Sequence, residues 1–498
     1  MRGELLVSVL LTSCFSVHPE GGTLKCDSEG RCPEKYECVA GYCWPEGQGP
    51  ASDGGSDAQV NADGGDMRMP MCTTNSQCTT PTQPICDQST LNCRGCMAHT
   101  ECGGATPKCH MLTGACVECL LDAACPPAKP VCSMARVCGN CRRHSDCASG
   151  ICNADGSCVA QSDVAYVNAD SAACMDTAHT STPASPYCNL PPAVSVSGKS
   201  RFVIAGATNT YGGISLNSNG GIANWVFVGP GRLAPAVARV NGVNKPAIEL
   251  QYGGTGTLDV RIDGLVLSGI GTNGTSVTCT GGAPNTNTKL LVQRSDLRLS
   301  DLQGLKASNC DVVLDGVAIH TNLKGGIELS QCDFTIVNAL VYGNGGASSD
   351  TGGITTSVGG VRKVIANVTI VNNVNSTGSL YPSGLACTSG TLVFNALLFG
   401  NTGGTEIVTG NCNPKYSAYA SATDGMDGNR AISSCVGADL FVGSSDFHLN
   451  KTGGGKPACV MVDKGTSSSA GVMAPAADLD GTSRPQGATV DIGAYESM

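Results

Sequence analysis

The sequence predicts an all-β protein in which a right-handed parallel β-helix solenoid follows small disulfide-rich repeat modules. Three observations predict it: the composition, a cysteine repeat early in the chain, and short β-type runs that recur at a fixed spacing later on. Of 498 residues, 66 are Gly and 30 are Cys, while only 4% are aromatic and 14% are charged. Many sharp turns joined by short aliphatic runs explain this composition better than a helix-rich enzyme does.

Cysteines recur in sets of four that open with the spacing C-x5-C and start 22 to 24 residues apart from residue 72 onward. This periodicity predicts four tandem units over residues 72–158, and a similar set predicts one more unit over residues 26–43. The sets are Cys72, Cys78, Cys86 and Cys93; Cys96, Cys102, Cys109 and Cys116; Cys119, Cys125, Cys132 and Cys138; Cys141, Cys147, Cys152 and Cys158; and, nearer the N-terminus, Cys26, Cys32, Cys38 and Cys43.

Three C-x2-C pairs invite a zinc or redox interpretation, but each pair straddles a boundary between two units. A zinc site needs converging pairs or a recurring histidine, and a redox pair normally lies in a βαβ context. We take the histidines of this region to occupy unrelated positions in their units. We therefore predict structural disulfides, with zinc or redox chemistry as the alternative. The pairs are Cys93/Cys96, Cys116/Cys119 and Cys138/Cys141, and the histidines are His99, His110 and His144.

A unit of this size has too few aliphatic residues to fold through a hydrophobic core alone. Two cross-links per unit, each contributing about 3 kcal/mol, can replace that core. The spacing leaves the connectivity open. It resembles Dickkopf-type cysteine-rich and related small disulfide repeats of bacterial surface proteins, a resemblance that implies no particular ligand. Residues 44–71, rich in Gly and Asp, predict a flexible linker.

The first 14 residues have the pattern of an export signal. Arg2 precedes a short apolar run that is not long enough to span a bilayer. Residues 11–14 resemble the bacterial lipobox, which implies a lipoprotein-type signal peptide and lipidation of Cys14; cleavage to a soluble secreted protein is the alternative. Both predict an extracellular or outer-membrane surface location, where thiols become disulfides.

The charge balance excludes one class of partner. The chain has 30 basic and 40 acidic residues, a formal net charge of -10 and a pI near 5.2. No stripe of Lys or Arg could neutralise phosphates, so we expect no nucleic-acid partner. We expect membrane contact only through the lipid anchor.

Short apolar runs broken by Gly, Asn or Asp fill the chain after residue 163. In residues 258–263 apolar and polar side chains alternate, as in a strand with one face in a core. Three later runs carry an asparagine at the same place, and a second one follows six residues later: Asn338, Asn367 and Asn395, then Asn344, Asn373 and Asn401. The first three are 29 and 28 residues apart, which predicts one solenoid coil per interval.

We expect the first asparagine of each run to form a strand-to-strand corner. Asparagine tolerates the left-handed backbone conformation, and its amide can hydrogen-bond from coil to coil. Aliphatic residues of neighbouring coils would then stack inward as one core. The same corner in earlier coils is assigned to Asp263, Ser295 and Asp315.

Two stretches resemble a known family. Residues 164–170 and 182–190 are similar to the opening segment of bacterial β-helix proteins, and residues 478–496 resemble the C-terminal signature of the choice-of-anchor Q class of pectate-lyase-like surface proteins. This resemblance implies a β-helix over residues 163–498. Its last part, 478–498, places Asp478, Asp480 and Asp491 around Arg484 and next to Tyr495. We predict a salt-bridged cap over the last coil, with a calcium site at those three carboxylates as the alternative.

The remaining cysteines are fewer and irregularly spaced. Cys174 and Cys188 are expected to form a bridge near the start of the solenoid. Cys310 and Cys332 lie about one coil apart and could bond. Seven cysteines lie in the coils, so at least one thiol is expected to stay free or to pair across domains: Cys279, Cys310, Cys332, Cys387, Cys412, Cys435 and Cys459.

A catalytic site needs a dense polar patch on one outward face. The best candidates for a groove are Asp259, Arg261, His320 and Lys324, provided that their coils are in register; ordinary solvated positions are the alternative. Exposed aromatic platforms for sugars are scarce, and Trp225 is expected in the core.

Together these patterns predict an exported, lipid-anchored surface protein that acts in adhesion or structural display without catalysis. Its solenoid would bind an extended glycan or a surface protein, with no cofactor except possible calcium. The alternative is a polysaccharide lyase or glycoside hydrolase with a groove on the coils between residues 250 and 365. A third class is a small-domain inhibitor or receptor ligand built from the cysteine repeats. The oligomeric state stays open.

Overall fold

A computed structural model describes two short strands near the N-terminus and most of the chain from residue 72 onward. The described parts are β1 (Tyr36–Val39), β2 (Tyr42–Pro45) and residues 72–497 apart from 112, 134, 219–223, 255, 283–286, 347–351, 358, 378–381 and 408–410. The chain divides into two units, residues 1–71 and 72–498. The predicted signal peptide, Cys14, the linker from residue 46 and the side chains of Cys26, Cys32, Cys38 and Cys43 lie outside the described residues.

Each of the four units from Cys72 onward consists of a short 3-10 turn followed by a hairpin. In the fourth unit the hairpin is reduced to one antiparallel bridge between Cys152 and Cys158. The elements are η1 (Asn75–Gln77), β3 (Ile85–Asp87) and β4 (Asn92–Arg94); η2 (His99–Glu101), β5 (Lys108–His110) and β6 (Ala115–Val117); η3 (Asp122–Ala124), β7 (Val131–Cys132) and β8 (Cys138–Gly139); and η4 (His144–Asp146).

Two disulfides close every unit, and their connectivity is always first to third and second to fourth. The bridges are Cys72–Cys86, Cys78–Cys93, Cys96–Cys109, Cys102–Cys116, Cys119–Cys132, Cys125–Cys138, Cys141–Cys152 and Cys147–Cys158. The prediction of disulfide-bonded repeats is confirmed. Cysteine sulfurs do gather closely in these units, but all of them are consumed in bridges, so they offer no thiolates to zinc.

The histidines of the repeats are not at unrelated positions, so that expectation is wrong. His99 and His144 both stand three residues after the first cysteine of their unit, where the other two units have Asn75 and Asp122. In every unit this side chain accepts a hydrogen bond from the backbone N–H of the third cysteine, at 2.7 to 3.0 Å. The position is conserved within the chain because Asn, Asp and neutral His can all accept that bond, and no metal is needed to explain it.

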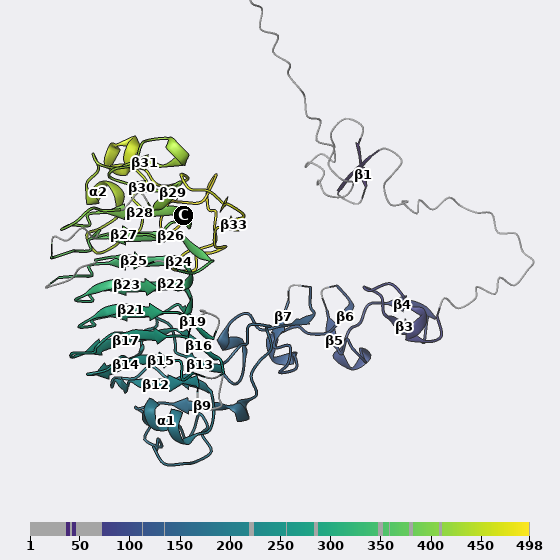
Figure 1. The fold of residues 1–498 in the computed structure, drawn as a ribbon. Helices are drawn as coiled ribbons and strands as arrows, with labels where there is room; N and C mark the ends of the chain where they lie inside the picture. Colours follow the sequence, from purple (N-terminus) through teal and green to yellow (C-terminus); the bar gives the residue numbers. More distant parts are fainter. Residues whose placement is uncertain are drawn as a thin grey trace, which may run out of the picture. The chain divides into compact units, whose positions relative to one another are not determined.

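After residue 163 the chain forms a parallel β-helix with three faces (Figure 1). The first face holds β9 (Val164–Val167), β10 (Arg201–Ile204), β13 (Asn224–Val228), β16 (Leu258–Asp263), β19 (Thr288–Gln293) and the first halves of β22 (Asp311–His320), β24 (Asp333–Tyr342), β26 (Lys363–Val371) and β28 (Thr391–Phe399). The second face holds β11 (Tyr211–Gly212), β14 (Ala238–Val243), β17 (Leu265–Ile270), β20 (Asp296–Arg298) and the second halves of β22, β24, β26 and β28.

The third face is a separate sheet of seven strands; of the remaining elements, α1 lies at the start of the solenoid and the others follow its last coils. The third face is β12 (Ile214–Asn217), β15 (Ile248–Gln251), β18 (Val277–Thr280), β21 (Gln303–Ser308), β23 (Gly325–Ser330), β25 (Ile354–Thr356) and β27 (Leu385–Ala386). The others are α1 (Leu190–Val196), β29 (Cys412–Lys415), β30 (Ala418–Tyr419), β31 (Arg430–Ala431), α2 (Gly437–Leu440), β32 (Ser468–Ser469) and β33 (Val472–Met473). Neither helix has the length or apolar character of a membrane span, and no other described helix does.

The corner between the first and second faces has a left-handed backbone. Asn338, Asn367 and Asn395 have φ values of 49°, 52° and 52°, as the sequence predicts. In earlier coils the assignment is wrong by one residue: Asp315 pairs with Val337, so the residue aligned with Asn338 is Gly316. The left-handed residues there are Gly264, Arg294 and Gly316, in place of the predicted Asp263, Ser295 and Asp315. Glycine adopts this conformation without a steric cost, and two of the three positions use it.

An asparagine ladder runs inside the solenoid where the second face ends. Asn344, Asn373 and Asn401, which the sequence identifies, are joined at one end by Asn322, which it does not. In chain order, the Nδ2 of each of the first three donates to the Oδ1 of the next asparagine at 2.9 Å, and all four Nδ2 groups donate to a backbone carbonyl. Buried amides need such partners, so the ladder fixes the stacking of four successive coils.

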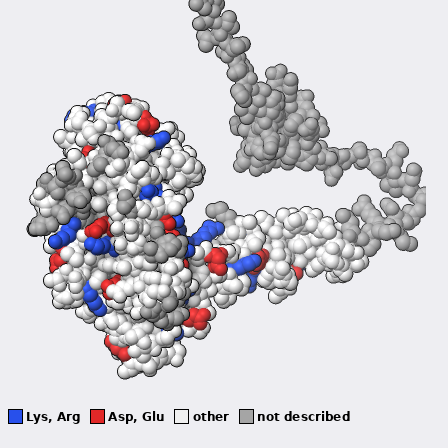
Figure 2. All heavy atoms as spheres, in the orientation of Figure 1, with Lys and Arg blue, Asp and Glu red and all other residues white. Residues whose placement is uncertain are grey.

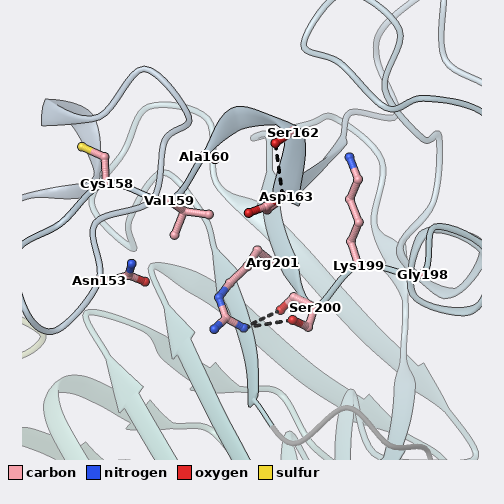
Figure 3. A pocket seen from close by; sticks show the side chains of 10 residues that line it. All are labelled: Asn153, Cys158, Val159, Ala160, Ser162, Asp163, Gly198, Lys199, Ser200 and Arg201. Atoms are coloured by element: carbon pink, nitrogen blue, oxygen red, sulfur yellow. Dashed lines mark hydrogen bonds between the residues drawn. The ribbon is translucent and has the colours of Figure 1, made fainter. Parts of the chain in front are cut away.

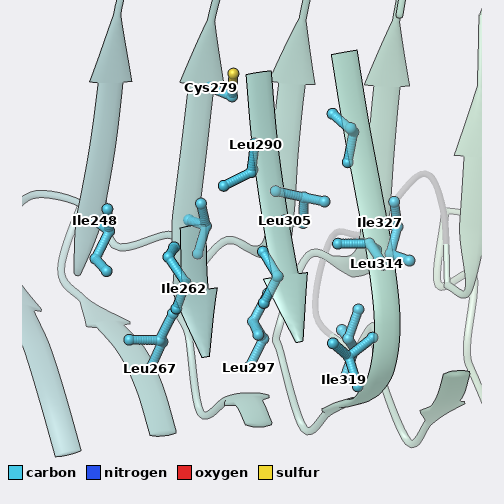
Figure 4. Close-up of a cluster of buried hydrophobic side chains, with 14 of the residues drawn as sticks. Ile248, Ile262, Leu267, Cys279, Leu290, Leu297, Leu305, Leu314, Ile319 and Ile327 are labelled. Carbon is cyan, nitrogen blue, oxygen red and sulfur yellow. The ribbon is translucent and has the colours of Figure 1, made fainter. Parts of the chain in front are cut away.

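The core is a set of aliphatic columns that run along the solenoid (Figure 4). Ile262, Val292, Leu314 and Ile336 are register partners in four successive coils, and each is fully buried. Burial of such a side chain contributes about 1.5 to 3 kcal/mol. Trp225 lies in the same core, stacked on Phe227, as expected.

The solenoid contains four disulfides, one of which corrects a prediction. Cys174–Cys188 is present as expected, and Cys279–Cys310, Cys387–Cys412 and Cys435–Cys459 accompany it. The suggested Cys310–Cys332 bridge is wrong because Cys310 bonds to Cys279 in the preceding coil. Cys332 is therefore a free thiol; it is buried, and burial raises the pKa of its thiol. Its Sγ instead accepts a hydrogen bond from the backbone N–H of Cys310.

The C-terminal segment, residues 475–497, lies along the side of the solenoid and not over its last coil, so the predicted end cap is misplaced. Ile492 and Ala494 pack against outward aliphatic residues of the second face. Near residue 480 the segment reaches the loop after β13, where Arg232 donates to the carbonyl of Leu479 at 3.0 Å. Burying the outward apolar residues Leu340, Val371 and Leu397 of β24, β26 and β28 favours this lateral position. Thr369, which stands in register between Leu340 and Leu397, accepts a hydrogen bond from the backbone N–H of Ala494 at 3.0 Å.

Candidate functional site

The four residues predicted as a catalytic group do not come together. Asp259 and Arg261 project from β16 on the first face. His320 ends β22 on the second face, beyond the corner at Gly316, where its Nε2 lies 3.1 Å from Asp296 and its ring stacks on Tyr342. Lys324 is an exposed residue of the turn before β23. The coils do stack in register, but the corner between the first and second faces separates Asp259 and Arg261 from His320 and Lys324.

The fourth disulfide repeat packs directly on the first face of the solenoid. Its Ile151 is fully buried in a cluster with Val164, Tyr166 and Val228. The Tyr166 hydroxyl donates to the carbonyl of Ser149 in the repeat at 3.1 Å. This contact holds the fourth repeat over the first coils, so the repeat lines the cavities between it and the solenoid.

A buried polar network completes this contact. His144 is 7% exposed and Asp263 1%. The Nδ1 of His144 accepts from the backbone N–H of Cys152, so its Nε2 carries the proton and donates to Asp263 Oδ2 at 2.9 Å. The same carboxylate binds Arg261 at 3.1 Å and Arg294 at 2.8 Å. One aspartate thus joins the repeat to two coils of the solenoid.

The charge of Asp263 depends on these partners. Burial alone would raise the pKa of its carboxyl, but the hydrogen bond from His144 and the charges of Arg294 and Arg261 outweigh burial, and the pKa falls below its ordinary value of 3.8. A depressed folded-state pKa stabilises the folded protein above pH 3.8, and this stabilisation disappears as the pH falls through the folded-state value. The network is therefore fully formed at neutral pH.

Replacing Asp263 with Asn should lower the free energy of unfolding by about 3 kcal/mol at pH 7, because His144 and Arg261 then lose a buried charged partner. Urea unfolding of the full chain measures it. Asp259→Asn is the matched control: this carboxyl lies two residues earlier on β16, makes no ion pair within the described part of the chain, and burial raises its pKa. An equal loss in both variants would contradict the role given to Asp263.

Two adjoining cavities open beside this network, and we call them together the junction cleft. The smaller has a volume of about 330 Å³ and is lined by the fourth repeat and by Arg261, Asp263 and Arg294. The larger, about 690 Å³, lies between the corner residues, the loop 230–234 and the segment 475–481. Arg143, Gln293 and Arg294 line both, so the two form one hollow.

The smaller part of the junction cleft is locally basic in a chain of net charge -10, whereas the larger part also holds Asp315, Asp478 and Asp480 beside its arginines. Four arginines and a single carboxylate line its smaller part: Arg142, Arg143, Arg261, Arg294 and Asp263. Arg142 and Arg143 are exposed and make no ion pair within the described residues. In the larger part, burial raises the pKa of Asp315, although a hydrogen bond from Asn338 opposes this shift. On the face drawn in Figure 2 basic and acidic side chains are interspersed, and most of the described surface is uncharged.

Sequence reasoning placed none of Arg142, Arg143 and Arg294 in this site, and Arg294 is the one with an unusual backbone. Its φ of 45° puts a large side chain at a corner that other coils fill with Gly or Asn. A strained backbone conformation costs free energy, and it persists where contacts of the surrounding structure hold it, often at functional sites. The signal was present in the sequence: once Gly316 and Asn338 are aligned, Arg294 stands alone among corner residues.

The three aspartates predicted as alternative calcium ligands are directed to different partners. The Asp478 carboxylate accepts backbone N–H groups of residues 480, 482 and 496, and the Asp491 carboxylate accepts those of residues 463 and 497. Asp480 points away, toward Arg232 and His448. Arg484 is paired with Glu496, at 3.7 Å, in place of the predicted aspartates. Within the described ranges no three carboxylate or histidine side chains come within ligand distance of one another.

Comparison with known proteins adds little. No family model matches the chain, and no curated protein matches it. A solved structure described as the crystal structure of pectate lyase Pel9A aligns with a TM-score of 0.36 and 14% identity, over 67% of this chain and 96% of that chain. At this TM-score the likeness carries no argument about function, and the β-helix fold is established by the strand pairing itself.

Proposed function

We propose that this protein is an exported, lipid-anchored surface protein whose junction cleft binds an extended anionic glycan without cleaving it. The observation that carries the proposal is the group of four arginines around one carboxylate in a hollow beside the solenoid. Guanidinium groups pair with carboxylates through two parallel hydrogen bonds, which suits acidic sugars. The hollow continues from the smaller part into the larger one past Arg143, Gln293 and Arg294, so an elongated ligand can occupy both parts.

Export is supported by the cysteines as well as by the first 14 residues. Twelve disulfides close within residues 72–459, and structural disulfides persist outside the reducing cytoplasm. Lipidation at Cys14 would hold the solenoid at the cell surface. Adhesion to a polymer needs such an anchor, whereas a diffusing enzyme does not.

The test is calorimetric titration of the full chain with polygalacturonate, and with a neutral glucan as ligand control. We expect binding of the acidic polymer only, weakened by salt because exposed charges are screened. Arg143→Gln and Arg294→Asn should each weaken binding about tenfold, since a charged hydrogen bond contributes about 1.5 kcal/mol or more. Arg294→Asn keeps a residue that suits the left-handed corner, and Asp263 keeps its bonds to His144 and Arg261.

Lys289→Gln is the matched control, because Lys289 projects from β19 on the first face but lines neither cavity. If it weakens binding as much as Arg294→Asn, the cleft is not the site. Shortening of the polymer during incubation would overturn the non-catalytic proposal in favour of a polysaccharide lyase or hydrolase. Absence of binding to any acidic glycan would overturn the proposed ligand class.

A further inference from the structure

A third cavity, of about 530 Å³, lies on the other side of the fourth repeat (Figure 3). Val159 of the repeat forms one wall, and Asp163, Lys199 and Arg201 form the other. Asn153 lines this cavity and also the junction cleft, so the two hollows meet at one residue. None of the sequence patterns considered above points to this place.

Among the described residues, the two cations of this cavity have no ion-pair partner. Lys199 Nζ donates to the carbonyl of Val164 at 2.7 Å, and Arg201 Nη1 donates to the carbonyl of Asn224 at 2.6 Å. Neither has a carboxylate within 4.0 Å in the described part of the chain. Burial lowers the pKa of both side chains; the charge of Asp163 partly opposes this at Lys199, and the charges of Asp259 and Asp163 partly oppose it at Arg201. Positive charge that is partly desolvated and unpaired is what an anionic group would stabilise.

The register of the first face connects Arg201 to the junction cleft. Arg201 pairs with Val226, and Val226 pairs with Arg261, so the two arginines stand in one outward column. Arg294 follows β19, one coil further on. Three strand spacings of about 4.8 Å separate the coil of Arg201 from that of Arg294, or about 14 Å along the solenoid.

We propose that the cavity around Lys199 and Arg201 is a second anion subsite, and that one linear carboxylated glycan occupies it together with the junction cleft. This inference rests on the proposed function and adds a length requirement to it. The ligand must carry acidic groups about 10 to 14 Å apart, because Arg261 and Arg294 lie two and three strand spacings from Arg201, so an acidic monosaccharide cannot fill both places. Binding to the two subsites by one chain raises affinity without any new contact in either.

The experiment is a titration of the full chain with uronic-acid oligomers of increasing length. Affinity should rise with length until the oligomer spans both subsites, and then level off. Arg201→Gln and Lys199→Gln should weaken the long oligomers about tenfold and leave the shortest unchanged. Arg201→Lys, which keeps the charge, should retain most of the affinity for long oligomers. Lys324 is an exposed cation outside both subsites, so Lys324→Gln should change the affinity for neither the long nor the short oligomers.

The outcomes separate this inference from the function on which it rests. If Arg294→Asn weakens binding but Arg201→Gln does not, or if short and long oligomers bind equally, the second subsite is wrong and the junction cleft stands. If no oligomer binds, both are wrong. If polyphosphate or single-stranded DNA binds as tightly as the uronic-acid oligomers, the ligand is a polyanion of another class and the assignment to glycans is wrong.

Discussion

Replacing Asn373 with Ala is expected to lower the free energy of unfolding of the solenoid by about 4 kcal/mol. Its Oδ1 accepts from the backbone N–H and the side-chain amide of Asn344, at 3.0 and 2.9 Å. Its Nδ2 donates to the carbonyl of Val341 and to Asn401 Oδ1, both at 2.9 Å. Truncation leaves these buried groups without partners, and each costs about 1 to 3 kcal/mol.

Urea unfolding followed by far-UV circular dichroism measures the effect. Asn372→Gly is the matched control, because Asn372 is the exposed neighbour with a φ of 54°, a conformation that glycine adopts without cost. We expect it to change stability by less than about 1 kcal/mol. If both variants lose the same stability, the ladder does not hold the coils together.

Reduction should unfold the four repeats and leave the solenoid folded. Cysteines form nearly all of the buried clusters in the repeats, and each bridge closes a loop of 11 to 15 residues. Such a bridge contributes about 3 kcal/mol, which these units cannot replace by apolar packing. The solenoid has a continuous aliphatic core and therefore survives the loss of its own disulfides.

Limited proteolysis with and without dithiothreitol measures this difference. With reductant, new cleavage sites should appear within residues 72–140, while a fragment that begins near residue 164 persists. A chelator alone should change nothing. Protection that survives reductant but is lost on adding a chelator would show that metal, not disulfide, holds the repeats.

The fold could be predicted from the sequence because its two signals are local. Four cysteines recur at nearly constant spacing, and Asn338, Asn367 and Asn395 mark the same corner of successive coils. The corner was misplaced in earlier coils because Asp and Ser are also common turn residues, and only the strand register shows that Gly316 takes the left-handed position. Local chemistry identifies a turn, but long-range pairing fixes its register.

The candidate site could not be predicted, because it depends on contacts between distant segments. His144 meets Asp263 across 119 residues, and Arg232 meets Asp480 across 248. Neither pair has a local sequence pattern. The C-terminal segment was misplaced for a related reason: its charged residues suggested an end cap, but the apolar Ile492 and Ala494 determine where it packs.

The central claim is that the coils stack in the register that brings Arg261, Arg294 and the fourth repeat to one cleft. Disulfide mapping by mass spectrometry of the unreduced, protease-digested protein tests it most directly, because Cys279 and Cys310 belong to coils on either side of β19 and Arg294. The account predicts a Cys279–Cys310 bridge, a Cys141–Cys152 bridge and a free Cys332. A Cys310–Cys332 bridge, or bonds between different repeats, would contradict it.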